Sequence, residues 1–158
     1  SNETQLKTIV NGIEYNLMVP ARLLASDFLR DNLNLTGTHV GCEHGICGSC
    51  TIKIDGLTAR SCLKFAVQLD GKKVETVESF KEKPETRNIL EKFKAHHSLQ
   101  CGFCTPGFLM IIDELLKSKI KFSENEIREA LSGNLCRCTG YENIIKAAKE
   151  ILAHKGIK

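Results

Sequence analysis

The spacing of hydrophobic and polar positions divides the chain into two unlike parts. In residues 1–77, apolar side chains mostly alternate with polar ones, which is the period of a half-buried strand. In residues 87–158 they recur three and four positions apart, as on one face of a helix. The sequence therefore predicts a strand-rich part followed by a helical part, which is an α+β protein.

The first part is predicted to hold five strands and one helix. The dipeptides Asn11-Gly12 and Asp55-Gly56 favour the tight turns that close β-hairpins. Leucine and phenylalanine at helical spacing predict a helix over residues 23–32. The predicted strands are residues 4–10, 13–19, 51–54, 57–62 and 73–77.

The second part is predicted to hold four short helices. Thr105-Pro106 is a favourable start, because threonine can cap a helix and proline fits its first turn. Two later segments match the capping box, in which Ser or Thr precedes Glu by three positions. These segments are Ser123–Glu126 and Thr139–Glu142.

Residues 78–86 are polar, contain Pro84 and are predicted to link two domains, residues 1–77 and 87–158. The length of 158 residues, with 42% hydrophobic and 26% charged residues, is that of an ordinary globular protein. The longest wholly apolar run, residues 108–112, is far too short for a membrane span, and no secretion signal is visible. The net charge of +3 is spread out, so a nucleic-acid partner is not expected.

Cysteine spacing provides the strongest chemical pattern. Cys42, Cys47 and Cys50 have the spacing C-x4-C-x2-C, and Cys62 follows after a gap of eleven residues. This is the spacing of a plant-type [2Fe–2S] ferredoxin. Three glycines in the same loop allow tight bends, so that backbone N–H groups can approach the cysteine sulfurs.

The remaining cysteines form a second set of four, directly before the second and fourth predicted helices. Helix N-termini favour an anionic group, which suits an iron–sulfur cluster but equally suits zinc held by four thiolates. A disulfide scaffold fits poorly, because a chain of this length does not need cross-links. Metal binding without a secretion signal indicates a reducing, cytoplasmic compartment. The set comprises Cys101, Cys104, Cys136 and Cys138.

Three motifs occur in a fixed order: Gly41–Cys50 with Cys62, Gln100–Gly107 and Gly133–Tyr141. Together they resemble the small iron–sulfur subunit of the xanthine oxidase family of molybdenum hydroxylases, which includes carbon monoxide, nicotinate and aldehyde dehydrogenases. The resemblance implies an N-terminal β-grasp, plant-type ferredoxin-like domain with one [2Fe–2S] cluster. It also implies a C-terminal four-helix bundle domain with a second cluster.

The resemblance further implies an electron-transfer subunit of a multi-subunit oxidoreductase, which does not turn over substrate alone. Electrons would pass from a molybdenum cofactor through the two clusters to FAD. The cofactors would lie on a large molybdenum-binding subunit and a medium FAD-binding subunit, in a heterotrimer or a dimer of heterotrimers. Gln100 matches the glutamine that hydrogen-bonds the pterin of the molybdenum cofactor, and Cys138 matches the cluster ligand beside the pterin.

Two other function classes compete with this interpretation: a free-standing two-cluster ferredoxin or redox sensor, and a zinc-stabilised interaction module. Ile46 and Ser49 depart from the pattern of many family members but spare every ligand, which leaves the substrate open. The histidines at 44, 96 and 97 are expected in loop or surface roles, and Phe103 and Tyr141 in packing near the clusters.

Overall fold

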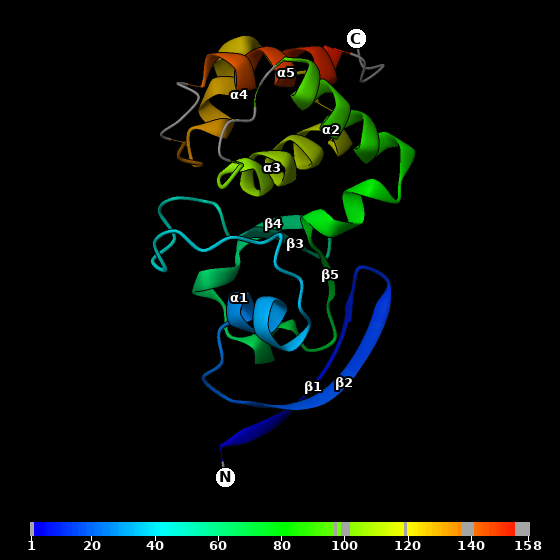
Figure 1. Cartoon of the computed structure of the whole chain (residues 1–158), viewed down its shortest axis with the longest axis vertical. Helices are drawn as coiled ribbons and strands as arrows, with labels where there is room; N and C mark the ends of the chain where they lie inside the picture. The colour runs from blue at the N-terminus through cyan, green and yellow to red at the C-terminus, as the bar shows by residue number, and fades with distance from the viewer. Residues whose placement is uncertain (1, 97, 99–101, 119, 137–140, 154–158) are drawn as a thin grey trace.

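The structure is a computed structural model that describes residues 2–96, 98, 102–118, 120–136 and 141–153. A mixed sheet with short helices forms one half of the molecule, and longer helices form the other (Figure 1). The predicted α+β class is thereby confirmed. No helix in the described ranges is long and apolar enough to cross a membrane.

The sheet has the strand order β2-β1-β5-β3-β4. β1 and β5 are parallel, whereas the other neighbouring strands are antiparallel. Both predicted hairpin turns are confirmed: Asn11 and Gly12 have φ of 51° and 81°, and Asp55 and Gly56 have φ of 50° and 85°. The strands are β1 (Glu3–Val10), β2 (Ile13–Pro20), β3 (Thr51–Ile54), β4 (Leu57–Arg60) and β5 (Lys73–Glu75).

The helix predicted over residues 23–32 is shorter and irregular. It consists of α1 (Ala25–Asp27) continued by a π-helix, η1 (Phe28–Asn32). Phe28 and Leu29 are fully buried, so the apolar face was identified correctly although the helix type was not. They join the core of the sheet half, which also includes Leu6, Val19, Ile52 and Val74. Three 3-10 helices follow in the chain: η2 (Ser61–Leu63), η3 (Ala66–Leu69) and η4 (Val77–Lys81).

The second half contains a separate apolar core. Phe93, Phe108, Ile112 and Ile144 belong to it, each almost completely buried. Its helices are α2 (Pro84–Ala95), α3 (Thr105–Lys117), α4 (Glu124–Leu131) and α5 (Glu142–Ala153). The capping box at Ser123 is confirmed, because its hydroxyl and the Glu126 carboxylate cap each other's backbone N–H groups. The predicted box at Thr139 lies outside the described residues.

The segment predicted as a linker is structured in the described chain. Its residues form most of η4 and the first turn of α2, which begins at Pro84. Proline is favourable there, because its fixed φ suits the first helical turn and its missing N–H is not needed. Phe80 packs into the helical core with 1% of its surface exposed. The exact domain boundaries at residues 77 and 86 stay a prediction.

The two halves are joined by polar contacts between the sheet and α3. Lys53 on β3 forms an ion pair with Asp113 on α3, and both side chains are buried. The backbone N–H of Thr58 on β4 donates to the Glu114 carboxylate at 3.1 Å. The side of the β3–β4 hairpin that faces away from the sheet core is thus covered by a helix.

We predict that Ser123→Ala loosens the start of α4. The substitution removes the hydroxyl that accepts from the Glu126 N–H, a loss that typically costs about 1 kcal/mol. Amide hydrogen exchange in the first turn of α4 should accelerate correspondingly. Ser132→Ala is the control, because its hydroxyl contacts only the Glu129 carbonyl at the other end of that helix. Equal exchange in both variants would contradict the prediction.

Candidate iron–sulfur sites

The first cysteine loop, residues 41–50, lies between the two halves of the molecule (Figure 1). It contains no helix or strand, and its backbone turns at Glu43, Gly45 and Gly48 have φ of 59°, 78° and 79°. Glycine has no Cβ and reaches such angles without steric cost. Cys62 joins the loop from η2, directly after β4, as the sequence predicted.

Backbone N–H groups surround the sulfur of Cys42. The amides of His44, Ile46 and Cys47 point at its Sγ atom over distances of 3.5, 3.3 and 3.4 Å. The amides of Cys47 and then His44 contribute most to lowering the pKa of Cys42 to about 6. A thiolate, the form that binds iron, is therefore stabilised at this position before any metal binds.

The four thiols of this set form two contacting pairs, Cys42 with Cys47 and Cys50 with Cys62. None of the four forms a disulfide. Within the described ranges, no three Cys, His, Asp or Glu side chains lie close enough together to hold a single metal ion. In a [2Fe–2S] cluster each iron takes two thiolates and two bridging sulfides, so two thiol pairs suit it as donors.

Burial differs between the two pairs. Cys50 and Cys62 are 1% and 4% exposed, whereas Cys42 and Cys47 are partly exposed. Burial, followed by contact with Cys50, raises the pKa of Cys62 to about 11. Metal binding at Cys62 therefore requires loss of the thiol proton that burial favours. The inner pair is shielded from water, while the outer pair lies towards the molecular surface.

The second cysteine set is described only in part. Cys104 is the N-cap residue of α3, and Cys136 lies at the end of the segment that follows α4. The Cys136 N–H donates to the Tyr141 hydroxyl at 2.8 Å, and the Tyr141 ring packs edge-on against Phe108. The packing role predicted for Tyr141 fits these contacts. Cys101, Cys138 and Gln100 lie outside the described residues.

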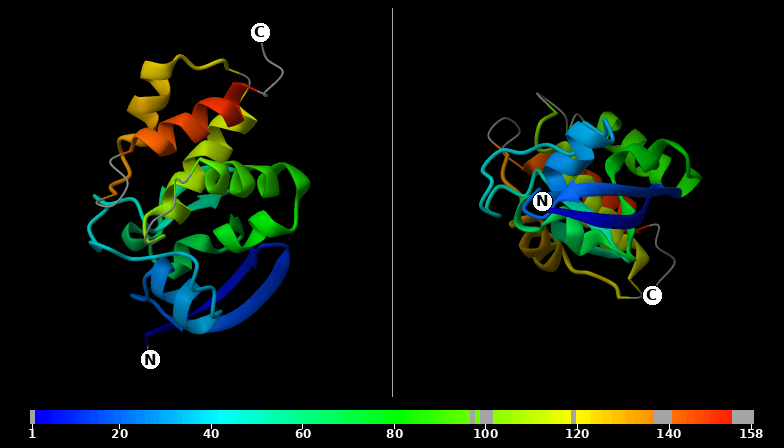
Figure 2. Two further views of the ribbon diagram at one scale, coloured as in Figure 1. Left: turned by 45° about the horizontal axis from the view of Figure 1, so that its top comes forward. Right: turned by 90° about the horizontal axis from the view of Figure 1, so that it is seen from below.

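The two cysteine sets are in direct backbone contact. The N–H of Leu135, next to Cys136, donates to the carbonyl oxygen of Cys47 at 2.8 Å. Figure 2 shows the loop of residues 41–50 beside the segment that carries Leu135. One hydrogen bond thus connects Cys47 of the first set to the residue next to Cys136 of the second set.

Asn134 packs into this contact and is completely buried. Its side-chain amide donates to the Cys104 carbonyl at 3.2 Å. A Cβ atom on Gly48 would lie 2.1 Å from the Asn134 Oδ1 atom, and one on Gly107 would lie 2.3 Å from it. A Gly107 Cβ would also lie 2.3 Å from the carbonyl oxygen of Gly48. Glycine is therefore required at Gly107 by the close approach of the Gly48 backbone, and at Gly48 by the packed Asn134 side chain and a φ of 79°.

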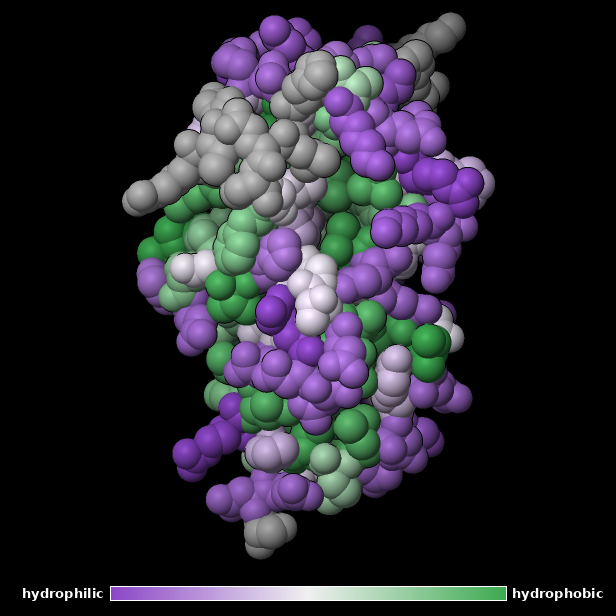
Figure 3. Space-filling view, in the orientation of Figure 1, coloured by the Kyte–Doolittle hydropathy of each residue, from purple (hydrophilic) through white to green (hydrophobic). Residues whose placement is uncertain are grey.

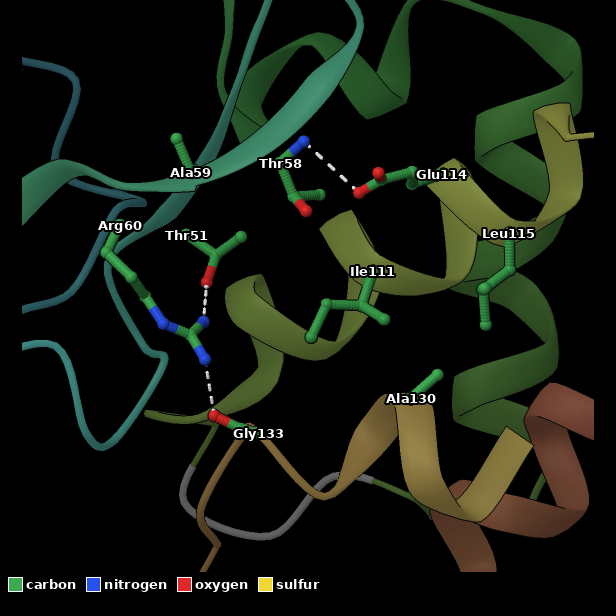
Figure 4. A pocket seen from close by; sticks show the side chains of 9 residues that line it. All are labelled: Thr51, Thr58, Ala59, Arg60, Ile111, Glu114, Leu115, Ala130 and Gly133. Carbon is green, nitrogen blue, oxygen red and sulfur yellow. Dashed lines mark hydrogen bonds between the residues drawn. The ribbon is translucent and has the colours of Figure 1, made fainter. Parts of the chain in front are cut away.

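Further contacts lie at the same boundary between the sheet half and the helical half of the molecule. His39 stacks on Phe103 with ring centroids 4.7 Å apart, and its Nδ1 lies 2.8 Å from the Phe103 carbonyl oxygen. Arg60 on β4 hydrogen-bonds the Thr51 hydroxyl and donates to the Gly133 carbonyl, beside a pocket of about 340 Å³ between the two halves (Figure 4). Sequence reasoning did not assign roles to His39, Arg60 or Asn134. Asn134 lies within a recognised motif, which was the available clue.

Two described histidines near the cysteines, His44 and His96, make contacts of other kinds. His44 is exposed and contributes its backbone N–H to Cys42, while the His96 ring pairs with the Glu150 carboxylate. Both outcomes agree with the predicted loop and surface roles, and His97 lies outside the described residues. Lys92 and then His96 lower the pKa of Glu150 to about 2, and these contacts join α2 to α5.

Exposed apolar side chains gather around the cysteines. Each of them lies within three residues of a cysteine in the chain, and about half of its surface is accessible. Figure 3 shows apolar surface on the side of the molecule that carries the first cysteine loop. The residues are Ile46, Leu63, Phe65, Phe103 and Leu135.

Comparison with known families places iron–sulfur domains over most of the chain. Residues 31–98 match a 2Fe-2S iron-sulfur cluster binding domain, and residues 76–149 match a [2Fe-2S] binding domain. The second match contains all four cysteines of the second set, which contradicts the zinc alternative for that set.

Individual relatives match along nearly their whole length. Caffeine dehydrogenase subunit gamma of Pseudomonas sp. (strain CBB1) is 53% identical over 145 residues, which are 90% of this chain and 87% of the relative. The nicotine 6-hydroxylase small subunit of Paenarthrobacter nicotinovorans is 46% identical over 158 residues, which are 100% of this chain and 95% of the relative.

A solved structure has the same fold. Quinoline 2-oxidoreductase from Pseudomonas putida 86 superimposes with a TM-score of 0.90 at 43% identity, covering 98% of this chain and 97% of that chain. The chain belongs to the small iron–sulfur subunits of the molybdenum hydroxylase family. It is an electron-transfer subunit with [2Fe–2S] clusters, and the molybdenum cofactor and FAD lie on partner subunits. The free-standing ferredoxin or sensor is not favoured.

We predict that serine substitutions remove the clusters one at a time. The full chain, reconstituted without oxygen, should hold four irons and four acid-labile sulfides, because its eight cysteines divide into two sets of four. Cys47→Ser and Cys136→Ser should each leave one intact cluster, measured as iron, sulfide and one remaining spin-resonance signal. Ser49→Ala, in the same loop without a ligand, should retain both. Loss of both signals from either cysteine variant, in a folded protein, would mean that the sets share ligands.

We also predict that Gly107→Ala destabilises the boundary between the halves. Alanine normally favours a helix over glycine by about 1 kcal/mol, so an unhindered site would be stabilised. Here the methyl group meets the Gly48 carbonyl and Asn134, and overpacking typically costs about 1–3 kcal/mol. The midpoint of thermal unfolding should fall at a fixed scan rate. A rise in the midpoint would show that the backbones can separate without cost.

Proposed function

We propose that the two clusters form a relay in which electrons enter at the C-terminal cluster and leave from the N-terminal one. Cys101, Cys104, Cys136 and Cys138 would hold the C-terminal cluster, where electrons enter. Cys42, Cys47, Cys50 and Cys62 would hold the N-terminal cluster, from which they leave. When bound, each cluster accepts and releases one electron. The chain's own residues fix where each cluster lies and which groups surround it.

The hydrogen bond from the Leu135 N–H to the Cys47 carbonyl is the observation that carries this proposal. It joins the backbone of Cys47, which would bind the N-terminal cluster, to the neighbour of Cys136, which would bind the C-terminal cluster, without an intervening side chain. Asn134, next to Leu135, is completely buried beside Gly48 and donates its side-chain amide to the Cys104 carbonyl. A short path through covalent bonds and one hydrogen bond connects the two cysteine sets. Such a path favours electron transfer between the clusters of one chain over transfer between separate molecules.

The order of the clusters follows from the resemblance. Gln100 and Cys138 match the family residues beside the pterin of the molybdenum cofactor, which assigns the C-terminal cluster to the molybdenum side. The N-terminal cluster then faces FAD. The partial exposure of Cys42 and Cys47 and the exposed Ile46 support contact between this loop and a partner.

The assembly we propose consists of this chain, a large molybdenum-binding subunit and a medium FAD-binding subunit, as a heterotrimer or a dimer of heterotrimers. Within the chain, we assign the sheet half as a β-grasp domain and helices α2–α5 as a four-helix bundle. The cytoplasm is the proposed compartment, supported by first-set cysteines that form no disulfide.

Nitrogen heterocycles are the proposed substrate class of the whole complex. Caffeine, nicotine and quinoline, named in the relatives reported above, all belong to this class. Substrate would bind on the large subunit, so this chain would affect electron removal rather than substrate choice. Purified complex should be reduced by members of this class, and preferential reduction by aldehydes would redirect the proposal.

We predict that Gln100→Ala impairs the connection to molybdenum while sparing both clusters. If the amide is buried against the pterin, its removal leaves a polar group unpaired, which typically costs about 1–3 kcal/mol. Iron content should stay at the wild-type value, because all four thiolates remain. Molybdenum content of the purified complex should fall, or reduction of the clusters by substrate should slow in stopped-flow measurements.

Gln5→Ala is the matched control for this experiment. It removes the same amide from an exposed position on β1, where Gln5 contacts only the side chain of Asn16 in the described structure. Wild-type molybdenum content and reduction rate in Gln100→Ala would show that Gln100 is an ordinary surface residue. The assignment of the C-terminal cluster to the molybdenum side would then lose its main support.

A further inference from the structure

A charged pair is buried at the boundary between the two halves. Lys53 on β3 and Asp113 on α3 have 1% and 0% of their side-chain surface exposed. Asp113 also pairs with Lys117 at 3.2 Å, one turn further along α3, where 44% of the lysine side chain is exposed. One carboxylate therefore interacts with a cation from each half of the molecule.

Net stability does not explain this pair. Taking both charges out of water costs so much that an apolar pair of similar volume often stabilises a protein equally well or better. Burial lowers the pKa of Lys53, and the neighbouring Asp113 carboxylate opposes that shift. The Oδ1 atom of Asp113 has no hydrogen-bond partner among the described groups, so the arrangement is not optimised for binding strength.

A buried ion pair does impose one alignment on the surfaces that it joins. Sliding β3 along α3 would separate Lys53 from Asp113 and leave both charges buried without a partner. Two apolar faces can slide with much less penalty, because hydrophobic contact is not directional. The pair therefore specifies the relative position of the strand and the helix.

Both partners are rigidly connected to cysteines. Lys53 lies three residues after Cys50 in the chain, and β3 begins directly after that cysteine. Asp113 lies nine residues after Cys104, which is the N-cap of α3, so about 13 Å of continuous helix separates them. The ion pair is thus a second point of attachment, away from the contact between Cys47 and Leu135. Two separated attachments resist rotation about either one.

We propose that the Lys53–Asp113 pair is a positioning element that fixes the separation of the two iron–sulfur clusters and thereby the rate of electron transfer between them. The proposal rests on the proposed function, in which both clusters belong to one path. Neither residue touches a cluster. Their effect is transmitted through β3 to Cys50 and through α3 to Cys104.

The test compares three variants of the full chain, reconstituted without oxygen. Lys53→Met breaks the pair across the boundary. Lys117→Met is the matched control, because it removes a cation from the same carboxylate without crossing the boundary. The double variant Lys53→Met/Asp113→Leu replaces the pair with apolar side chains, which keeps the boundary packed but removes its directional contact.

Four measurements separate the possible roles; the first is the rate at which an electron redistributes between the clusters after partial one-electron reduction. Iron and sulfide content tests the proposed function by itself. Amide hydrogen exchange in β3 and α3 reports on the boundary without depending on the clusters. The magnetic splitting between the two clusters in fully reduced protein reports on their separation, because it falls steeply with distance.

We expect wild-type protein and Lys117→Met to hold both clusters with the same sharp splitting. Lys53→Met should show faster exchange in both β3 and α3 and a weakened or broadened splitting. The double variant should recover slow exchange but keep the broadened splitting, together with slower electron transfer between clusters. Recovery of packing without recovery of the splitting is the signature of a positioning role.

A wild-type splitting in the double variant would overturn the proposal, because any packed boundary would then fix the clusters. The same holds for a wild-type splitting in Lys53→Met. A double variant that loads less iron than the wild type would assign the pair to folding and would also overturn it. Wild-type protein with fewer than two clusters would instead refute the proposed function.

Discussion

The close backbone approach between the two cysteine-bearing segments is the constraint on which the rest of the structure depends. Leu135 donates to the Cys47 carbonyl at 2.8 Å, and no side chain larger than hydrogen fits at Gly48 or Gly107. The buried amide of Asn134 packs against both glycines and donates to the Cys104 carbonyl. Each half has its own apolar core, and this approach brings the segments that carry the two cysteine sets together.

The boundary differs chemically from the two cores that it separates. The cores consist of aliphatic and aromatic side chains, whereas the boundary contains a buried ion pair and hydrogen bonds from Arg60, Asn134 and Thr58. Hydrogen bonds and ion pairs depend on direction and distance, so they define one geometry more sharply than apolar contact does. A subunit that transfers electrons needs fixed distances between its clusters, because the rate of electron transfer falls steeply with distance.

Much of the fold and of the first cysteine site could be predicted from the sequence. Cys42, Cys47 and Cys50 lie in the predicted loop, where local spacing and glycine-permitted turns set their positions, and Cys62 joins them directly after β4 as predicted. Lys53 could not be predicted as a buried residue. It alternates with Ile52 and Ile54 along β3, and a lysine at that position usually faces solvent. Only the packing of α3 on that side of the sheet, a tertiary event, buries it.

The contacts of the second cysteine site could not be predicted from the sequence either, although its cysteines could. Its cysteines were recognised through motifs, yet the backbone contact with Cys47 depends on how the two halves pack against each other. Neither the local cysteine spacing nor the helical periodicity that predicted α2–α5 indicates how the two halves pack against each other. Asn134 therefore looked like an ordinary member of a motif, although it is completely buried between the two segments.

The central claim is that the two clusters exchange electrons within one chain, and rapid one-electron reduction of the isolated full chain tests it most directly. A pulse that delivers less than one electron per molecule is followed by the optical and spin-resonance signals of the two clusters. Redistribution of the electron between clusters should proceed at a rate independent of protein concentration. A rate proportional to protein concentration would show that electrons move between molecules, and would contradict the account.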